Sequence, residues 1–82
     1  MEKHIGTVTH YYSRLSVAVL NLIDEIHLGD EIHIKGHITD LVMHVASLEI
    51  EHGKIESAGP GMDVALKVDD SVREGDKLYK VM

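Results

Sequence analysis

Apolar and polar residues alternate with a period of two in several short runs, which is the pattern of β-strands with one buried face. The runs cover residues 4–12, 31–36, 63–68 and 77–82. Turn sequences that contain glycine separate them, most clearly at 58–61, where a proline stands between two glycines. This arrangement predicts an all-β domain of short strands, built as a small barrel or a sandwich.

Two further runs depart from simple alternation. The run 15–22 is apolar on both faces, which predicts a strand buried on two sides; a helix over 15–28 is the main alternative, although the density of valine and isoleucine argues against it. In the run 41–52, the apolar residues change parity between Val45 and Leu48. A β-bulge near residues 46–47 would turn both sets toward one core, and we predict one there.

Length and composition narrow the choice of protein class. With 82 residues the chain has room for one domain, 1–82. It contains no cysteine, which fits a reducing cytoplasm, and it has no apolar run of about 20 residues that could cross a membrane. A net charge of −6 disfavours non-specific nucleic-acid binding, and the absence of Phe and Trp disfavours a broad base-stacking surface. We expect a cytoplasmic protein without a membrane segment.

One aromatic and basic cluster is the candidate binding patch. It consists of His10, Tyr11, Tyr12 and Arg14. The tyrosines could stack on a base or a sugar while Arg14 holds a phosphate. The alternative is structural, with the tyrosines covering the edge of the sheet and residues 13–14 starting a turn.

The seven histidines raise the question of a metal site. His33 and His44 fall on the outward faces of two strands expected to be neighbours, and a register that pairs Ile34 with Met43 would set them opposite each other. His37 or Asp40 could then supply a third ligand. The chain lacks a metalloprotease-type HExxH motif, and histidines on a solvated strand face explain the same pattern. We therefore expect no cofactor and keep His33 and His44 as the speculative metal ligands.

Four motifs follow one another in an order that resembles a known domain. They span 28–36, 45–50, 58–66 and 72–76, and read LGDEIHIKG, VASLEI, AGPGMDVAL and VREGD. Together they resemble the second domain of translational GTPases such as elongation factor Tu, a six-stranded Greek-key β-barrel. The chain is also similar to the C-terminal barrel of collagenase-like peptidases and to stand-alone elongation-factor-like proteins. The resemblance implies that the glycines of these motifs, Gly36 among them, lie in turns.

The sequence also differs from this family at two points that concern function. The first hairpin of the family is rich in glycine and lies near the aminoacyl end of tRNA, whereas here residues 15–20 read LSVAVL, which puts tRNA-end binding in doubt. The chain has no phosphate-binding GxxxxGK(S/T) loop, so we expect no GTP hydrolysis by the chain alone.

The carboxylates flank no evident nucleophile, and we do not expect an enzyme. The leading hypothesis is a non-catalytic adaptor that docks on a translation-associated protein or ribonucleoprotein. The alternatives are a detached accessory domain acting with a collagenase-like peptidase or an RNA-modifying enzyme, and a self-associating barrel that forms a homodimer.

Overall fold

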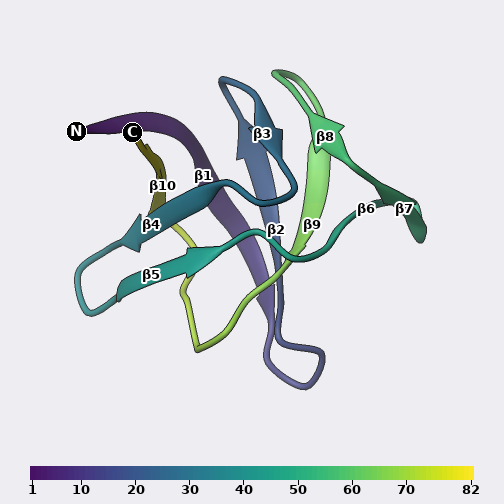
Figure 1. The fold of residues 1–82 in the computed structure, drawn as a ribbon. Helices are drawn as coiled ribbons and strands as arrows, with labels where there is room; N and C mark the ends of the chain where they lie inside the picture. Colours follow the sequence, from purple (N-terminus) through teal and green to yellow (C-terminus); the bar gives the residue numbers. More distant parts are fainter.

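The computed structural model describes all residues 1–82 and contains strands and turns but no helix. Figure 1 shows the ten strands, whose bounds are β1 Glu2–Tyr12, β2 Val17–Leu22, β3 Ile26–His27, β4 Glu31–Lys35, β5 Asp40–His44, β6 Leu48–Ile50, β7 Gly53–Ile55, β8 Ser57–Ala58, β9 Asp63–Lys67 and β10 Lys77–Val81. The all-β prediction is confirmed, and the helical alternative for 15–28 is wrong. No helix is present that could span a membrane.

Eight strands form one antiparallel sheet in the order β5-β4-β10-β1-β2-β9-β6-β7, and β3 pairs with β8 in a separate ribbon. The end strands β5 and β7 are not paired with each other, so the sheet stays open. The six-stranded Greek-key barrel is therefore not confirmed. The alternating pattern identifies strands that face a core, but whether the two edges meet depends on long-range pairing that the pattern does not contain.

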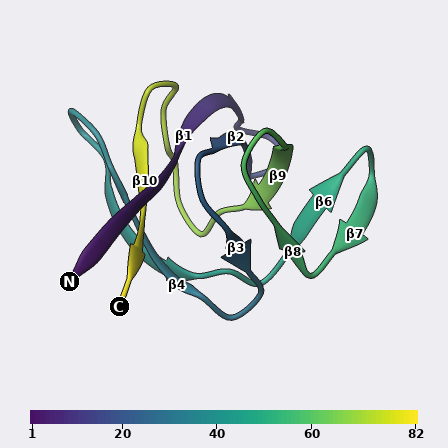
Figure 2. The same ribbon diagram turned by 90° about the horizontal axis from the view of Figure 1, so that it is seen from above.

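Strand β1 bends the sheet around the core. Its register shifts between His4 and Gly6 on the side that pairs with β10, and again between Val8 and His10 on the side that pairs with β2. Such irregularities bend a strand and increase its twist. Figure 2 shows the result, with the sheet curling round the interior and the β6–β7 hairpin projecting to one side.

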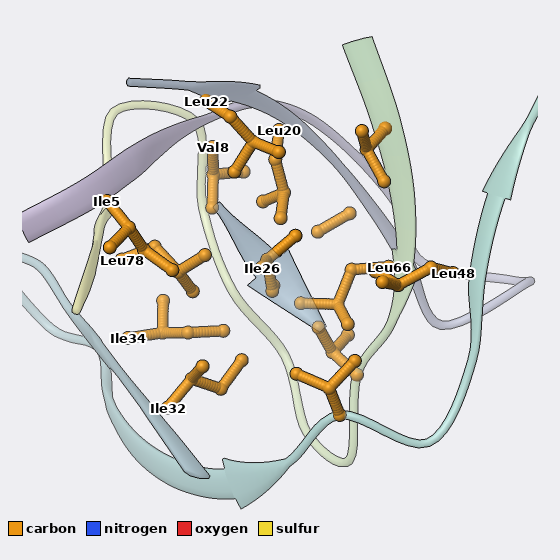
Figure 3. Close-up of a cluster of buried hydrophobic side chains, with 14 of the residues drawn as sticks. Ile5, Val8, Leu20, Leu22, Ile26, Ile32, Ile34, Leu48, Leu66 and Leu78 are labelled. Carbon is orange, nitrogen blue, oxygen red and sulfur yellow. The ribbon is translucent and has the colours of Figure 1, made fainter. Parts of the chain in front are cut away.

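A cluster of 17 buried apolar residues fills the interior. Figure 3 shows side chains from both halves of the sheet converging on Ile26 of the short strand β3. Leu20, Ile34 and Leu66 have no exposed surface. These aliphatic side chains supply the main stabilising term, because each fully buried one contributes about 1.5–3 kcal/mol relative to solvent exposure.

The predicted bulge near 46–47 takes another form. The chain leaves strand structure over 45–47, so that β5 pairs with β4 whereas β6 pairs with β9 and β7. Val45 and Leu48 are nevertheless both buried, at 2% and 1% exposure. The two sets of residues do both face the core, as the parity change predicts. The cause is a break between β5 and β6, at which the chain changes strand partner, and not a bulge within one strand.

The turn predicted at 58–61 is present between Gly59 and Met62. The Met62 N–H donates to the Gly59 carbonyl at 3.3 Å, and Gly61 has a φ of +83°. Proline at the second position and a left-handed glycine at the third are the residues that a type II turn requires. The glycine that needs its conformational freedom is thus Gly61 and not Gly59.

Candidate binding groove

The outer face of the sheet carries a groove over β2, β9 and the β6–β7 hairpin. The register places Val19, Ala65 and Glu49 side by side across β2, β9 and β6. The groove has a volume of about 810 Å³. Its lining residues are Tyr12, Leu15, Val17, Val19, Ser47, Glu49, His52, Lys54, Ala65 and Lys67.

The floor of the groove is apolar and comes mainly from β2 and the turn before it. Leu15 is 61% exposed, while Val17 and Val19 are half-buried. The prediction that 15–22 is buried on both sides is therefore wrong: Ala18, Leu20 and Leu22 face the core, whereas the opposite face meets only the groove. Two sequence signals pointed to this site, namely the apolar second face of this strand and Tyr12 in the predicted binding patch.

The rim of the groove carries more positive than negative charge. Lys54 lies 3.9 Å from Glu49, its only carboxylate partner. Lys67 donates from Nζ to the Leu15 carbonyl at 3.1 Å and contacts no carboxylate. Lys67 therefore keeps an unneutralised charge at the rim, in a chain whose net charge is −6. Such a rim attracts the carboxylate groups of a ligand more strongly than the rest of the surface does.

The β6–β7 hairpin positions His52 at the groove. Glu51 and His52 form its two-residue loop and have φ values of +50° and +67°. Two left-handed residues in succession match the type I′ turn that joins tightly twisted strands. Because glycine or asparagine normally fills such a loop, nothing in the sequence marked a hairpin here, and the Ser47, Glu49, His52 and Lys54 side of the groove was missed.

The predicted binding patch is divided between the two faces of β1. The His10 and Tyr12 rings lie together, with centroids 4.3 Å apart, and His10 Nδ1 is 3.3 Å from a carboxylate oxygen of Glu74. Tyr12 borders the groove, whereas Tyr11 packs partly against the core on the opposite face. Arg14 lies in the turn after β1, beside a shallow depression that Tyr12 and Leu15 also line. Of the four patch residues only Tyr12 lines the groove, while Tyr11, Tyr12 and Arg14 together line the adjoining depression. A binding role for the patch stays a prediction.

The two histidines considered as metal ligands do not face each other. The register pairs His33 with Val42 and His44 with Glu31, two residues away from the alignment that would oppose them. His33 instead donates from Nε2 to Asp40 and lies with Nδ1 2.6 Å from Glu2. These two carboxylates lie at opposite ring nitrogens, so their oxygens do not converge on one point with the imidazole, as metal ligands must. No group of three or more His, Asp or Glu side chains in the chain is arranged to hold a metal ion.

The carboxylates around His33 change its ionisation. Hydrogen bonds to Asp40 and then to Glu2 raise the pKa of His33, and the same contact with His33, followed by Lys35, lowers the pKa of Glu2. Lys35 Nζ lies 2.9 Å from Glu2 and 4.7 Å from the centre of the Tyr79 ring. The cluster ties the first residues of β1 to β4 and β5, and its role is structural.

We expect the stability that His33 provides to depend on pH. Because its pKa is raised on folding, the contribution is full below the unfolded value of about 6.5 and is lost as the pH rises through the folded pKa. The lowered pKa of Glu2 acts at the acid end, where its contribution is lost as the pH falls through the folded value. Thermal unfolding should be measured from acid to alkaline pH. Near pH 6 the melting temperature of the wild type should exceed that of His33→Gln by a few degrees, which is the shift expected from the loss of a weak ion pair.

The control for this measurement is His37→Gln. The His37 side chain is exposed and makes no hydrogen bond or ion pair. Its melting temperature should follow wild type at every pH. An unchanged difference between wild type and His33→Gln across the whole range would contradict the assignment.

No protein-family model matches the chain. Among curated proteins, "Uncharacterized protease MJ0090" of Methanocaldococcus jannaschii is 40% identical over 76 residues, which are 92% of this chain and 19% of that protein. A "Collagenase" of Porphyromonas gingivalis is 35% identical over 79 residues, 94% of this chain and 22% of that protein. The chain is homologous to one domain of the collagenase-like peptidases.

The fold agrees with this homology. A crystal structure of the C-terminal domain of a candidate U32 peptidase from Geobacillus thermoleovorans superposes with a TM-score of 0.90, covering 98% of this chain and 93% of that domain at 20% identity. At that identity the likeness concerns the fold alone. The chain spans about a fifth of the length of the curated relatives it matches. These findings support the collagenase-like part of the resemblance, and the elongation-factor part stays a prediction.

Proposed function

We propose that this chain is a non-catalytic accessory domain of a collagenase-like peptidase, and that its outer groove holds an extended peptide of the substrate for the catalytic unit. The observation that carries the proposal is the identity of 35–40% over more than nine-tenths of the chain to segments of an uncharacterized protease and of a collagenase. The accessory-domain alternative from the sequence thus has more support than the translation adaptor.

The groove has the chemistry that an extended acidic peptide requires. Its floor of Leu15, Val17 and Val19 offers apolar contact to side chains, and its rim offers Lys67 and Lys54 to carboxylates. Peptide sites usually combine an apolar surface with a few polar groups that set orientation. The catalytic residues would belong to the peptidase unit, and the role of this domain would be to raise the local concentration of substrate there.

Binding of labelled peptides of net negative charge, purified from heat-denatured collagen, tests the proposal, measured by fluorescence anisotropy with the wild-type chain and two variants. Leu15→Glu places a carboxylate in the floor of the groove and should weaken binding about tenfold or more, because it removes apolar contact and repels an acidic ligand. Leu15 is 61% exposed, so this change should leave folding intact.

Leu28→Glu is the matched control. Leu28 is 42% exposed and lies outside the groove, so its replacement adds the same charge without touching the site. Equal effects of the two variants, or no peptide binding by the wild type, would contradict the proposal. Binding of a single-stranded RNA that is lost in Tyr12→Ala/Arg14→Ala would instead favour the ribonucleoprotein adaptor.

A further inference from the structure

We propose that β5 is a homodimerisation edge, at which two copies of this chain pair antiparallel about Val42. The strand ends the order of the large sheet and has β4 as its only partner. Figure 1 shows β5 at the margin of the molecule, with no strand on its outer side. An unpaired edge is a template for a further strand. This site is separate from the groove, which lies toward the other end of the strand order.

The backbone of β5 determines which groups are free to pair. Hydrogen bonds from the Gly36 N–H to the Thr39 carbonyl and from the Val45 N–H to the Asp30 carbonyl, both 2.9 Å, close the two ends of the β4–β5 ladder. Bonded and non-bonded pairs alternate along an antiparallel ladder. Counting inward from either end, the N–H and C=O groups of Asp40, Val42 and His44 point away from β4. A second β5 centred on Val42 would meet these same three residues.

The side chains of β5 are complementary to themselves. Asp40, Val42 and His44 all lie on the outer face, with Val42 52% exposed. Antiparallel pairing about Val42 sets Asp40 opposite His44 of the second copy, twice, and Val42 opposite its equivalent. An imidazole donates a hydrogen bond to a carboxylate in either protonation state. The arrangement therefore satisfies the edge backbone and forms two side-chain hydrogen bonds at once.

The neighbouring strand extends this complementarity. Lys35 lies opposite Asp40 on β4, and Glu31 lies opposite His44. In the dimer a row would run from Lys35 and Asp40 of one copy to His44 and Glu31 of the other, with hydrogen-bond donors and carboxylates alternating at each step. Asp40 also accepts from His33, which holds its carboxylate on the outer face. Opposite charges in adjacent strands stabilise pairing, whereas like charges oppose it.

The other free edge is less suited to this role. β7 has three residues, and Lys54 at its centre is the kind of residue that blocks edge pairing. Pairing of β5 with β7 of another copy would also be head-to-tail and would not close as a dimer, whereas pairing of β5 with β5 does.

Sedimentation velocity of the chain, from about 10 μM to about 1 mM, tests the proposal, since an interface of this small size supports weak association. Wild type should shift from monomer to dimer and stop there. His44→Asp sets two carboxylates opposite each other at both ends, and Asp40→His removes the carboxylate acceptors at both ends and leaves imidazole opposite imidazole. Each variant alone should dimerise roughly tenfold more weakly than wild type.

Mixing the two variants gives the decisive measurement. In a mixed dimer, Asp40 of the first variant meets His44 of the second, and the introduced His meets the introduced Asp. The mixture should therefore dimerise more strongly than either variant alone, which a change in folding of the monomers would not produce. A mixture no better than its components would overturn the proposal.

A second pair of variants tests the centre of the interface. Val42→Lys sets two lysines opposite each other and should abolish the dimer, while Ile23→Lys, at a side chain of similar exposure in the loop after β2, should leave it unchanged. A wild type that stays monomeric throughout, or that grows beyond the dimer, would also overturn the proposal.

Discussion

Replacement of Gly36 by alanine is expected to destabilise the domain by about 2–4 kcal/mol, a large part of the 5–15 kcal/mol that holds a typical domain folded. A Cβ atom at Gly36 would lie 1.8 Å from Asp76 Oδ1 and 2.6 Å from its Cγ. The Asp76 side chain is short, and the residue is 4% exposed, so it has little freedom to move aside.

Asp76 is held in this position from several directions. Its Oδ2 accepts the Arg73 N–H at 2.8 Å, and its carbonyl accepts the Val8 N–H at 2.8 Å. Displacing the carboxylate would break the first bond and leave a buried charged group without its donor, which is the costly outcome. Displacing the backbone would disturb the central strand β1.

Urea unfolding of Gly36→Ala, Asp76→Ala and the double variant measures this contact. The double variant should be more stable than the sum of the single effects predicts, because removing the carboxylate makes room for the new methyl group. Gly59→Ala is the control, since its Cβ would meet nothing nearer than 3.9 Å. Additive effects of the two single changes would contradict the proposed clash.

Replacement of Leu20 by alanine is expected to lower the free energy of unfolding by about 2–5 kcal/mol. Leu20 has no exposed surface and lies at the centre of β2, opposite Val8 on β1 and Val64 on β9. Both partners are themselves buried, so the surrounding side chains have little room to collapse into the cavity. A domain of this size has few other buried contacts to compensate.

Chemical unfolding monitored by circular dichroism gives the free energy for Leu20→Ala, Leu20→Met and Leu28→Ala. The methionine variant keeps most of the volume and should lose less than about 1.5 kcal/mol. Leu28 is 42% exposed, and the same truncation there should change stability by about 0.5 kcal/mol or less. Comparable losses at Leu20 and Leu28 would show that the core is not centred where the structure places it.

The alternating pattern allowed the strand class to be predicted, because a period of two reflects a local rule: successive side chains of a strand point to opposite faces. Ile32 and Ile34 follow that rule and have no exposed surface. The parity change between Val45 and Leu48 also predicted correctly that both residues face the core. The same pattern could not distinguish a bulge from a change of strand partner, because both shift parity by one residue.

The register of β4 against β5 could not be predicted from the sequence. The alignment that would oppose His33 and His44 differs from the observed one by two residues, and both alignments keep Ile32, Ile34 and Met43 on the same face. Since a shift by two preserves burial, only the loop between the strands distinguishes the alternatives. That single difference replaces a pair of histidines by the ion cluster of His33, Glu2 and Asp40.

The groove likewise could be predicted only in part from the sequence. Val17 and Val19 were recognisable as an apolar second face of their strand, and Tyr12 as part of an aromatic cluster. Their meeting with Lys54 and Lys67 depends on β9 and the β6–β7 hairpin lying beside β2, which is a contact between residues far apart in the chain.

By itself the sequence therefore determined the strand class, the core-facing positions of the alternating runs and the absence of disulfide cross-links, since each follows from residue type or from spacing within one short segment. The tertiary structure decided whether the sheet closes, which strands are neighbours, and why Gly36 must be glycine. The sequence could assign that glycine only to a turn, whereas the reason for it is the Asp76 carboxylate, 40 residues further along the chain. Such contacts arise only when distant segments pack together, and local sequence patterns do not specify which segments become neighbours.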